Sequence, residues 1–147
     1  MTAQEYLEQL VLMQEVVYEK EAFLKELKRR TTSLNSQNLQ SPKVSGGYLS
    51  NEKGFSELIA KVSLAEEDLN KTMKEYFNLR AEIVSKIHKL KKLTYVKFLY
   101  KRHVEFKTLN VIAEEIHISY EYARQLPKKS LKEFEKVHED FLNNYKE

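Results

Sequence analysis

Apolar side chains near the start of the chain recur at alternating intervals of four and three residues. This spacing places them along one face of a helix, and another helix must cover that face. Lys20 interrupts the series once. We therefore predict a first helix over residues 3–27. The apolar positions are Ala3, Tyr6, Leu10, Met13, Val17, Leu24 and Leu27.

A second and longer stretch repeats every seven residues. One heptad position holds Phe55, Val62, Leu69, Tyr76, Ile83 and Leu90, and the other holds Leu58, Ala65, Thr72, Leu79, Lys86 and Leu93. A repeat kept this long predicts a helix with a continuous apolar seam. At a rise of about 1.5 Å per residue, this helix is roughly 55 Å long.

Residues 31–54 separate the two patterns and are rich in Ser, Asn, Gln, Pro and Gly. We predict a flexible loop there, because such a composition buries little apolar surface. The loop is long enough for the first helix to fold back antiparallel on the second. The expected fold class is all-α: a long, coiled-coil-like helical hairpin over residues 1–92, followed by a helix-turn-helix module over residues 93–147.

Three hydroxyl residues in the C-terminal part can cap short helices. We expect Thr94 to cap residues 95–102, Thr108 to cap residues 109–116, and Ser119 to cap the helix that follows. Three caps at short intervals predict a compact helical module.

Composition excludes several classes of protein. The 147 residues contain 3 Gly, 2 Pro, no Trp and no Cys, which argues against a β-rich fold, disulfides and thiolate metal sites. The four histidines show no spacing that pairs them as ligands, and we find no catalytic motif. No apolar run approaches the roughly 20 residues of a membrane span. We expect a cytoplasmic protein that is not an enzyme and needs no cofactor or metal.

Charge is unevenly distributed along the chain. Residues 1–85 carry 11 basic and 13 acidic side chains, whereas residues 86–147 carry 14 basic and 9 acidic ones. Positive potential therefore collects in the C-terminal part. This surplus of five positive charges is compatible with binding to nucleic acid but does not establish such binding, because a charged block often only faces solvent.

Residues 111–134 have the pattern of a helix-turn-helix motif. The first helix must cross the second closely, which requires a small residue at the crossing and β-branched residues around it. Ala113 is the small residue, and Ile112, Ile116 and Ile118 surround it, while Glu114 and Glu115 point to water. The turn is His117-Ile118.

On the helix after Ser119, we expect Ala123, Leu126, Leu131 and Phe134 to face the core. The remaining spacing gives an outward face suited to DNA. Arg, Gln and Glu side chains can read base edges in the major groove, and Lys and hydroxyl groups can hold phosphates. The candidate DNA-binding residues are Ser119, Tyr120, Glu121, Arg124, Gln125, Lys128 and Lys129.

The segment IAEEIHIS-YEYARQ-LPKKSLKEF, preceded by LYKRHVEFKTLNV, resembles the C-terminal DNA-binding region of housekeeping sigma factors, over about residues 93–136. Glu121, Arg124 and Gln125 match the groove-reading residues of that pattern, and Ser130-Leu131 matches its alanine-leucine pair. With its hairpin first, the chain is similar to small regulators of Gram-positive prophages, including the late-gene activators of the ArpU and RinA type. This resemblance implies a phage-encoded transcription regulator.

The sequence departs from the sigma pattern at three positions. His117 replaces the usual turn glycine, although His adopts positive φ more readily than most residues. Tyr120 replaces a basic residue, so the promoter preference need not be that of sigma factors. Pro127 lacks an N–H and clashes with the preceding turn, which predicts that the recognition helix kinks or ends near Leu126 and that Pro127 opens a final helix to about Asn143.

Two functions remain open from the sequence. In the first, the protein regulates transcription by binding double-stranded DNA, either as a homodimer through the hairpin or with help from RNA polymerase, because a lone motif makes few contacts. In the second, it is an adaptor that binds a partner, including RNA polymerase, through the hairpin and does not bind DNA.

Overall fold

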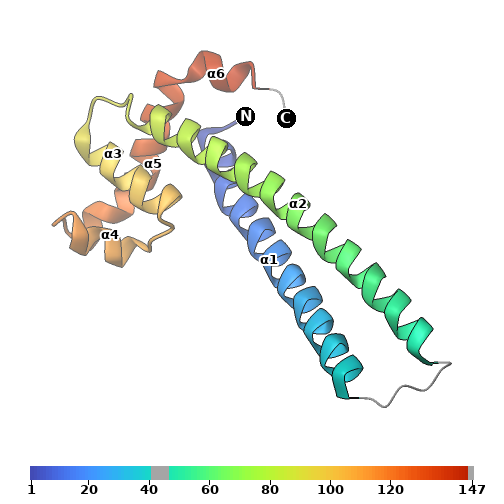
Figure 1. The fold of residues 1–147 in the computed structure, drawn as a ribbon. Helices are drawn as coiled ribbons and strands as arrows, with labels where there is room; N and C mark the ends of the chain where they lie inside the picture. The colour runs from blue at the N-terminus through green and yellow to red at the C-terminus, as the bar shows by residue number, and fades with distance from the viewer. Residues whose placement is uncertain (41–46, 146–147) are drawn as a thin grey trace. The chain divides into compact units, whose positions relative to one another are not determined.

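The computed structural model describes the backbone of residues 1–40 and 47–145, and the side chains of residues 1–34 and 53–145. No strand occurs over these backbone ranges, which confirms the all-α class and its long N-terminal helix pair. None of the described helices is long and apolar enough to cross a membrane. The elements in chain order are α1 (Ala3–Gln40), α2 (Gly47–Ile87), α3 (Leu93–Leu99), the π-helical turn η1 (Tyr100–Val104), α4 (Leu109–Glu115), α5 (Tyr120–Val137) and α6 (Glu139–Asn143) (Figure 1).

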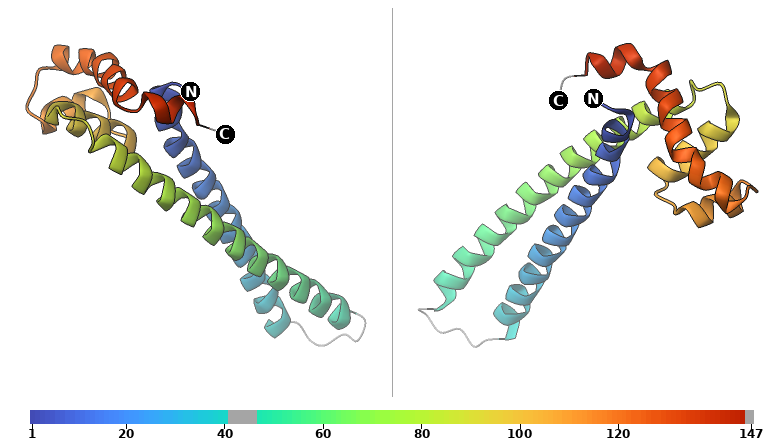
Figure 2. Two further views of the ribbon diagram at one scale, coloured as in Figure 1. Left: turned by 90° about the horizontal axis from the view of Figure 1, so that it is seen from above. Right: turned by 180° about the vertical axis from the view of Figure 1, so that it is seen from behind.

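The chain forms two compact units, and residues 15–74 make up one of them. In this unit α1 and α2 run antiparallel (Figure 2). Val17, Leu24 and Leu27 of α1 and Leu69 of α2 are buried, as the heptad pattern predicts. The Lys20 ammonium lies 2.9 Å from the Asp68 carboxylate and donates to the Thr72 hydroxyl at 2.7 Å. Lys20 thus interrupts the apolar seam without leaving a buried charge unpaired.

Both helices extend into the segment expected to be a loop. α1 continues to Gln40 and α2 begins at Gly47, so the loop prediction is wrong for residues 31–40 and 47–54; residues 41–46 lie outside the described backbone. The Thr31 hydroxyl donates to the Leu27 carbonyl at 2.9 Å, which lets a polar residue stay in a helix. Leu34 and Leu58 line one hollow in this unit. Both side chains are half-buried, so apolar residues stay partly covered past residue 30.

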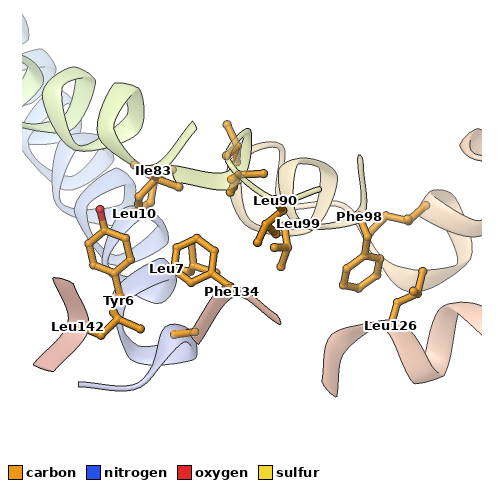
Figure 3. Packing of buried hydrophobic residues seen from close by; sticks show 14 residues of the cluster. Tyr6, Leu7, Leu10, Ile83, Leu90, Phe98, Leu99, Leu126, Phe134 and Leu142 are labelled. Carbon is orange, nitrogen blue, oxygen red and sulfur yellow. The ribbon is translucent and has the colours of Figure 1, made fainter. Parts of the chain in front are cut away.

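Residues 1–14 and 75–147 form the second compact unit. Its apolar cluster is assembled from both ends of the chain (Figure 3). The ring of Tyr6 stacks on Phe134 with centroids 6.2 Å apart, and its hydroxyl donates to Glu82 at 2.7 Å. The buried side chains include Leu7, Leu10, Ile83, Ile87, Leu90, Phe98, Leu99, Ile112, Leu126 and Leu142. The boundary expected near residue 92 stays a prediction about domain organisation.

The connection after α2 differs from the prediction. Lys92, rather than Thr94, occupies the N-terminal cap position of α3, and it makes no side-chain capping bond. Leu93, assigned to the seam of the long helix, is 64% exposed because α2 ends at Ile87 and α3 begins at Leu93. Leu90 is the last seam residue that is buried, and its N–H bonds the Ile87 carbonyl at 3.1 Å.

α5 runs without interruption through Pro127, so the predicted end near Leu126 is wrong. A proline inside a helix removes one hydrogen bond and strains the preceding turn. Leu126 before the proline and Phe134 after it are both fully buried, and this packing offsets the local cost. The helix ends instead at Val137, and Nε2 of the following residue, His138, lies 2.8 Å from the carbonyl oxygen of Lys86, which can only accept a hydrogen bond.

Candidate nucleic-acid interface

The turn between α4 and α5 is closed by a left-handed residue at His117. Its φ is +57°, and the N–H of Ile118 bonds the Ala113 carbonyl at 3.0 Å. This six-to-one hydrogen bond beyond a left-handed residue is a Schellman motif, which usually uses glycine at that position. His117 therefore adopts the conformation of the glycine that it replaces, at some steric cost.

Hydroxyl groups cap both helices of the motif, as the sequence predicts. The Thr108 hydroxyl accepts from the Val111 N–H at 3.5 Å, and the Ser119 hydroxyl accepts from the Tyr122 N–H at 3.1 Å. Each cap satisfies an N–H of a first turn that has no partner within its helix. Because the oxygen of Ser119 is the acceptor here, its own hydrogen remains able to donate to an anion.

α4 packs against α5 through buried small and apolar residues. Ile112 and Ala113 of α4 and Ala123 of α5 are buried, and Ile116 and Ile118 are half-buried. Ser130, at the place of an alanine in the sigma pattern, is also fully buried, and its hydroxyl donates to the Leu126 carbonyl at 2.5 Å. These residues fix the side of α5 that faces the core, and so the side that faces solvent.

The outward side of α5 carries all seven candidate DNA-binding residues. Each is exposed, and even the aromatic Tyr120 has 48% of its surface accessible to solvent. Gln125 accepts from the Lys129 ammonium at 3.2 Å. Within the described part of the chain, no ion pair engages Arg124, Lys128 or Lys129. The seven residues are Ser119, Tyr120, Glu121, Arg124, Gln125, Lys128 and Lys129.

Two further lysines extend this side of the helix. Lys132 and Lys136 follow Lys128 at intervals of four residues and are exposed. They were not among the candidates predicted from the sequence, which stopped at Lys129. Since α5 is continuous, residues at these intervals lie on one side of it. The signal that could have identified them is the repeated lysine spacing itself.

Two lysines elsewhere in the same unit are held by carboxylates. Glu115, expected to point to water, accepts from the Lys101 ammonium at 2.8 Å and from the Lys107 ammonium at 2.7 Å. These bonds lower the pKa of the Glu115 carboxyl and raise the pKa of Lys107. The cluster ties the end of α4 to the segment that follows α3. Its lysines already have anionic partners, in contrast to the lysines of α5.

Over the described residues, no group of three or more His, Asp or Glu side chains is placed to hold a metal ion. The site therefore offers hydrogen-bond donors, acceptors and positive charge on a convex helix surface. Comparison with protein-family models gave no match, and searches of curated proteins and of solved structures gave none either.

Proposed function

We propose that the protein is a transcription regulator that binds double-stranded DNA in a sequence-specific manner, with α5 in the major groove. The observation that carries this proposal is the exposed, mainly basic side of α5, directly after a capped turn of helix-turn-helix geometry. A helix presented in this way fits the major groove, which is about 12 Å wide. The resemblance to sigma factors and prophage regulators supports the same function.

Each exposed side chain has a role in this proposal. Arg124 donates two parallel hydrogen bonds to a guanine, Gln125 pairs with an adenine, and Glu121 accepts from a cytosine amino group. Lys128 and Lys129 contact phosphates, with help from the hydroxyls of Ser119 and Tyr120, which set the register on the duplex without reading sequence.

A single motif makes few contacts, so the proposal includes a source of further affinity. We propose a second copy of the chain, joined through the helical hairpin, or RNA polymerase bound at the same promoter. In this proposal the protein acts in the cytoplasm as a binding protein and not as an enzyme.

The first test selects binding sites from random duplex fragments. The wild type should enrich a short motif, and Arg124→Ala should relax the preference at one position by about 1–3 kcal/mol. Arg124→Lys is the matched control because it keeps the charge but loses the planar fork. Arg124→Lys should relax the base preference at the same position of the motif while leaving the salt dependence of binding unchanged.

Lys128→Ala tests the phosphate contact. It should weaken binding to every sequence equally and reduce the slope of log K against log salt by about 0.9. If Arg124→Ala also weakened all sequences equally, α5 would not read bases. If the wild type enriched no motif, the adaptor function, with a partner bound through the hairpin, would replace the proposal.

A further inference from the structure

The lysines of α5 extend well beyond the residues that can read bases. Lys128, Lys132 and Lys136 are spaced by four residues, or about 6 Å along the helix axis per interval. One DNA strand carries a phosphate every 3.4 Å or so of helix axis. The three side chains span about 12 Å, a length over which one strand presents more than one phosphate.

These lysines have no competing partner. Over the described residues, no ion pair engages Lys132 or Lys136, whereas Lys101 and Lys107 are both bonded to Glu115. Binding a phosphate at Lys132 or Lys136 thus breaks no existing ion pair. The exposed carboxylate of Glu135 accepts from the Ala3 N–H at 3.1 Å and forms no ion pair with either lysine.

An open hollow of about 830 Å³ adjoins these lysines, but it is not itself an anion pocket. Lys129, Lys132 and Lys136 contribute to its lining together with Glu133, Glu135 and Glu139. The charges of these three positive and three negative side chains cancel. The positive surface is the outward side of α5, and that surface suits an extended anion such as a nucleic-acid strand better than a small anion.

We propose that Lys132 and Lys136 bind the phosphate backbone of one DNA strand beyond the base pairs that Glu121, Arg124 and Gln125 read. This inference rests on the proposed binding of duplex DNA and enlarges its footprint. It requires α5 to lie along the groove over its full length, which the unbroken course of the helix through Pro127 permits.

The test compares Lys132→Gln/Lys136→Gln with the wild type on the enriched motif. Each lost phosphate contact should lower the magnitude of the salt slope by about 0.9, so the double variant should lose about 1.8. The enriched motif should stay the same. On a duplex trimmed on one flank, the wild type should lose affinity down to the level of the double variant, whose own affinity should not change.

Two controls separate phosphate contact from net charge and from folding. Lys71→Gln/Lys74→Gln removes two exposed lysines of α2 and should leave the salt slope unchanged. Lys132→Arg/Lys136→Arg keeps both charges and should retain the wild-type slope. Exposed substitutions of this kind change stability by less than about 0.5 kcal/mol, which thermal unfolding verifies.

The outcomes distinguish this inference from the proposed function. An unchanged slope in the glutamine variant, with the motif still enriched, would overturn the backbone contact alone. A reduced slope without any enriched motif would support the backbone contact but refute sequence reading. If the wild type bound no duplex at low salt, both proposals would be wrong.

Discussion

At the scale of single residues, His103 stands out by its surroundings. Its ring lines a hollow of about 360 Å³ together with Leu7, Phe106 and Leu131. Burial and, to a lesser extent, the nearby Arg102 charge lower the pKa of the imidazole, Glu8 opposes them, and the pKa that results is about 4. The ring is therefore neutral in the folded protein at neutral pH.

This depressed pKa predicts a dependence of stability on pH. Between the unfolded pKa of about 6.5 and the folded value, the unfolded chain binds the proton more strongly, so stability falls as pH falls. At pH 5 the loss attributable to His103 should be about 2 kcal/mol relative to pH 7.5. Urea unfolding measures the free energy of unfolding at the two pH values. Its change between them should be smaller in His103→Gln than in the wild type by that amount.

His103→Asn supplies the matched variant, because it also lacks an ionisable ring and should show the same reduced pH dependence as His103→Gln. An equal pH dependence in His103→Gln and the wild type would show that the ring at position 103 is protonated without cost in the folded protein.

His117 and Ser130 show which residue-scale features a sequence can predict. The sigma pattern has glycine at the turn position of His117, so the sequence left open whether the turn is strained there or differently shaped, and the structure gives His117 a positive φ of 57°. The hydrogen bond from buried Ser130 to the Leu126 carbonyl was not predicted. A serine in a charged segment carries no sequence signal of burial, which depends on the elements packed around it.

At the scale of elements, α5 is the main departure from expectation. Local rules end a helix before Pro127, yet the structure continues it to Val137. The reason is tertiary, because Leu126 and Phe134 both belong to the apolar cluster. A break in the helix between these two residues would remove one of their side chains from the apolar cluster.

We predict that the Pro127→Ala variant is more stable than the wild type. Pro127→Ala restores an N–H for the Ala123 carbonyl, and an interior proline costs about 3 kcal/mol relative to alanine. Loss of the ring contacts and a freer unfolded chain offset part of that gain. The free energy of unfolding in urea should rise by about 1–2 kcal/mol.

Lys128→Ala, on the neighbouring exposed position, should change stability by less than about 0.5 kcal/mol. A Pro127→Ala variant that is less stable than the wild type would mean that packing of the ring outweighs the lost hydrogen bond.

At the scale of the whole molecule, the proposed pairing of two copies concerns the hairpin unit. Val16 and Phe23 of α1 lie one heptad apart, on the same side of the helix, and are exposed. They are adjacent in sequence to the buried seam residues Val17 and Leu24. An apolar row beside the seam is the position that a further helix covers in coiled-coil assemblies.

If a second copy covers this row, Val16→Ser/Phe23→Ser should shift the protein from dimer to monomer. Sedimentation equilibrium over a range of concentrations measures this shift. Lys25→Ser, an exposed polar change on the same helix, should leave the association unchanged. A wild type that sediments as a monomer at all concentrations would contradict pairing through the hairpin.

The sequence by itself determined the two long helices, their buried seams, the caps at Thr108 and Ser119, and the outward position of the seven candidate residues. All of these follow from periodicity and from chemistry within a few residues. The tertiary structure alone decided the continuity of α5, the helical course of much of residues 31–54, the burial of Ser130 and the lysine pairs of Glu115. Each depends on partners distant in sequence, whose packing and charge outweigh local preference.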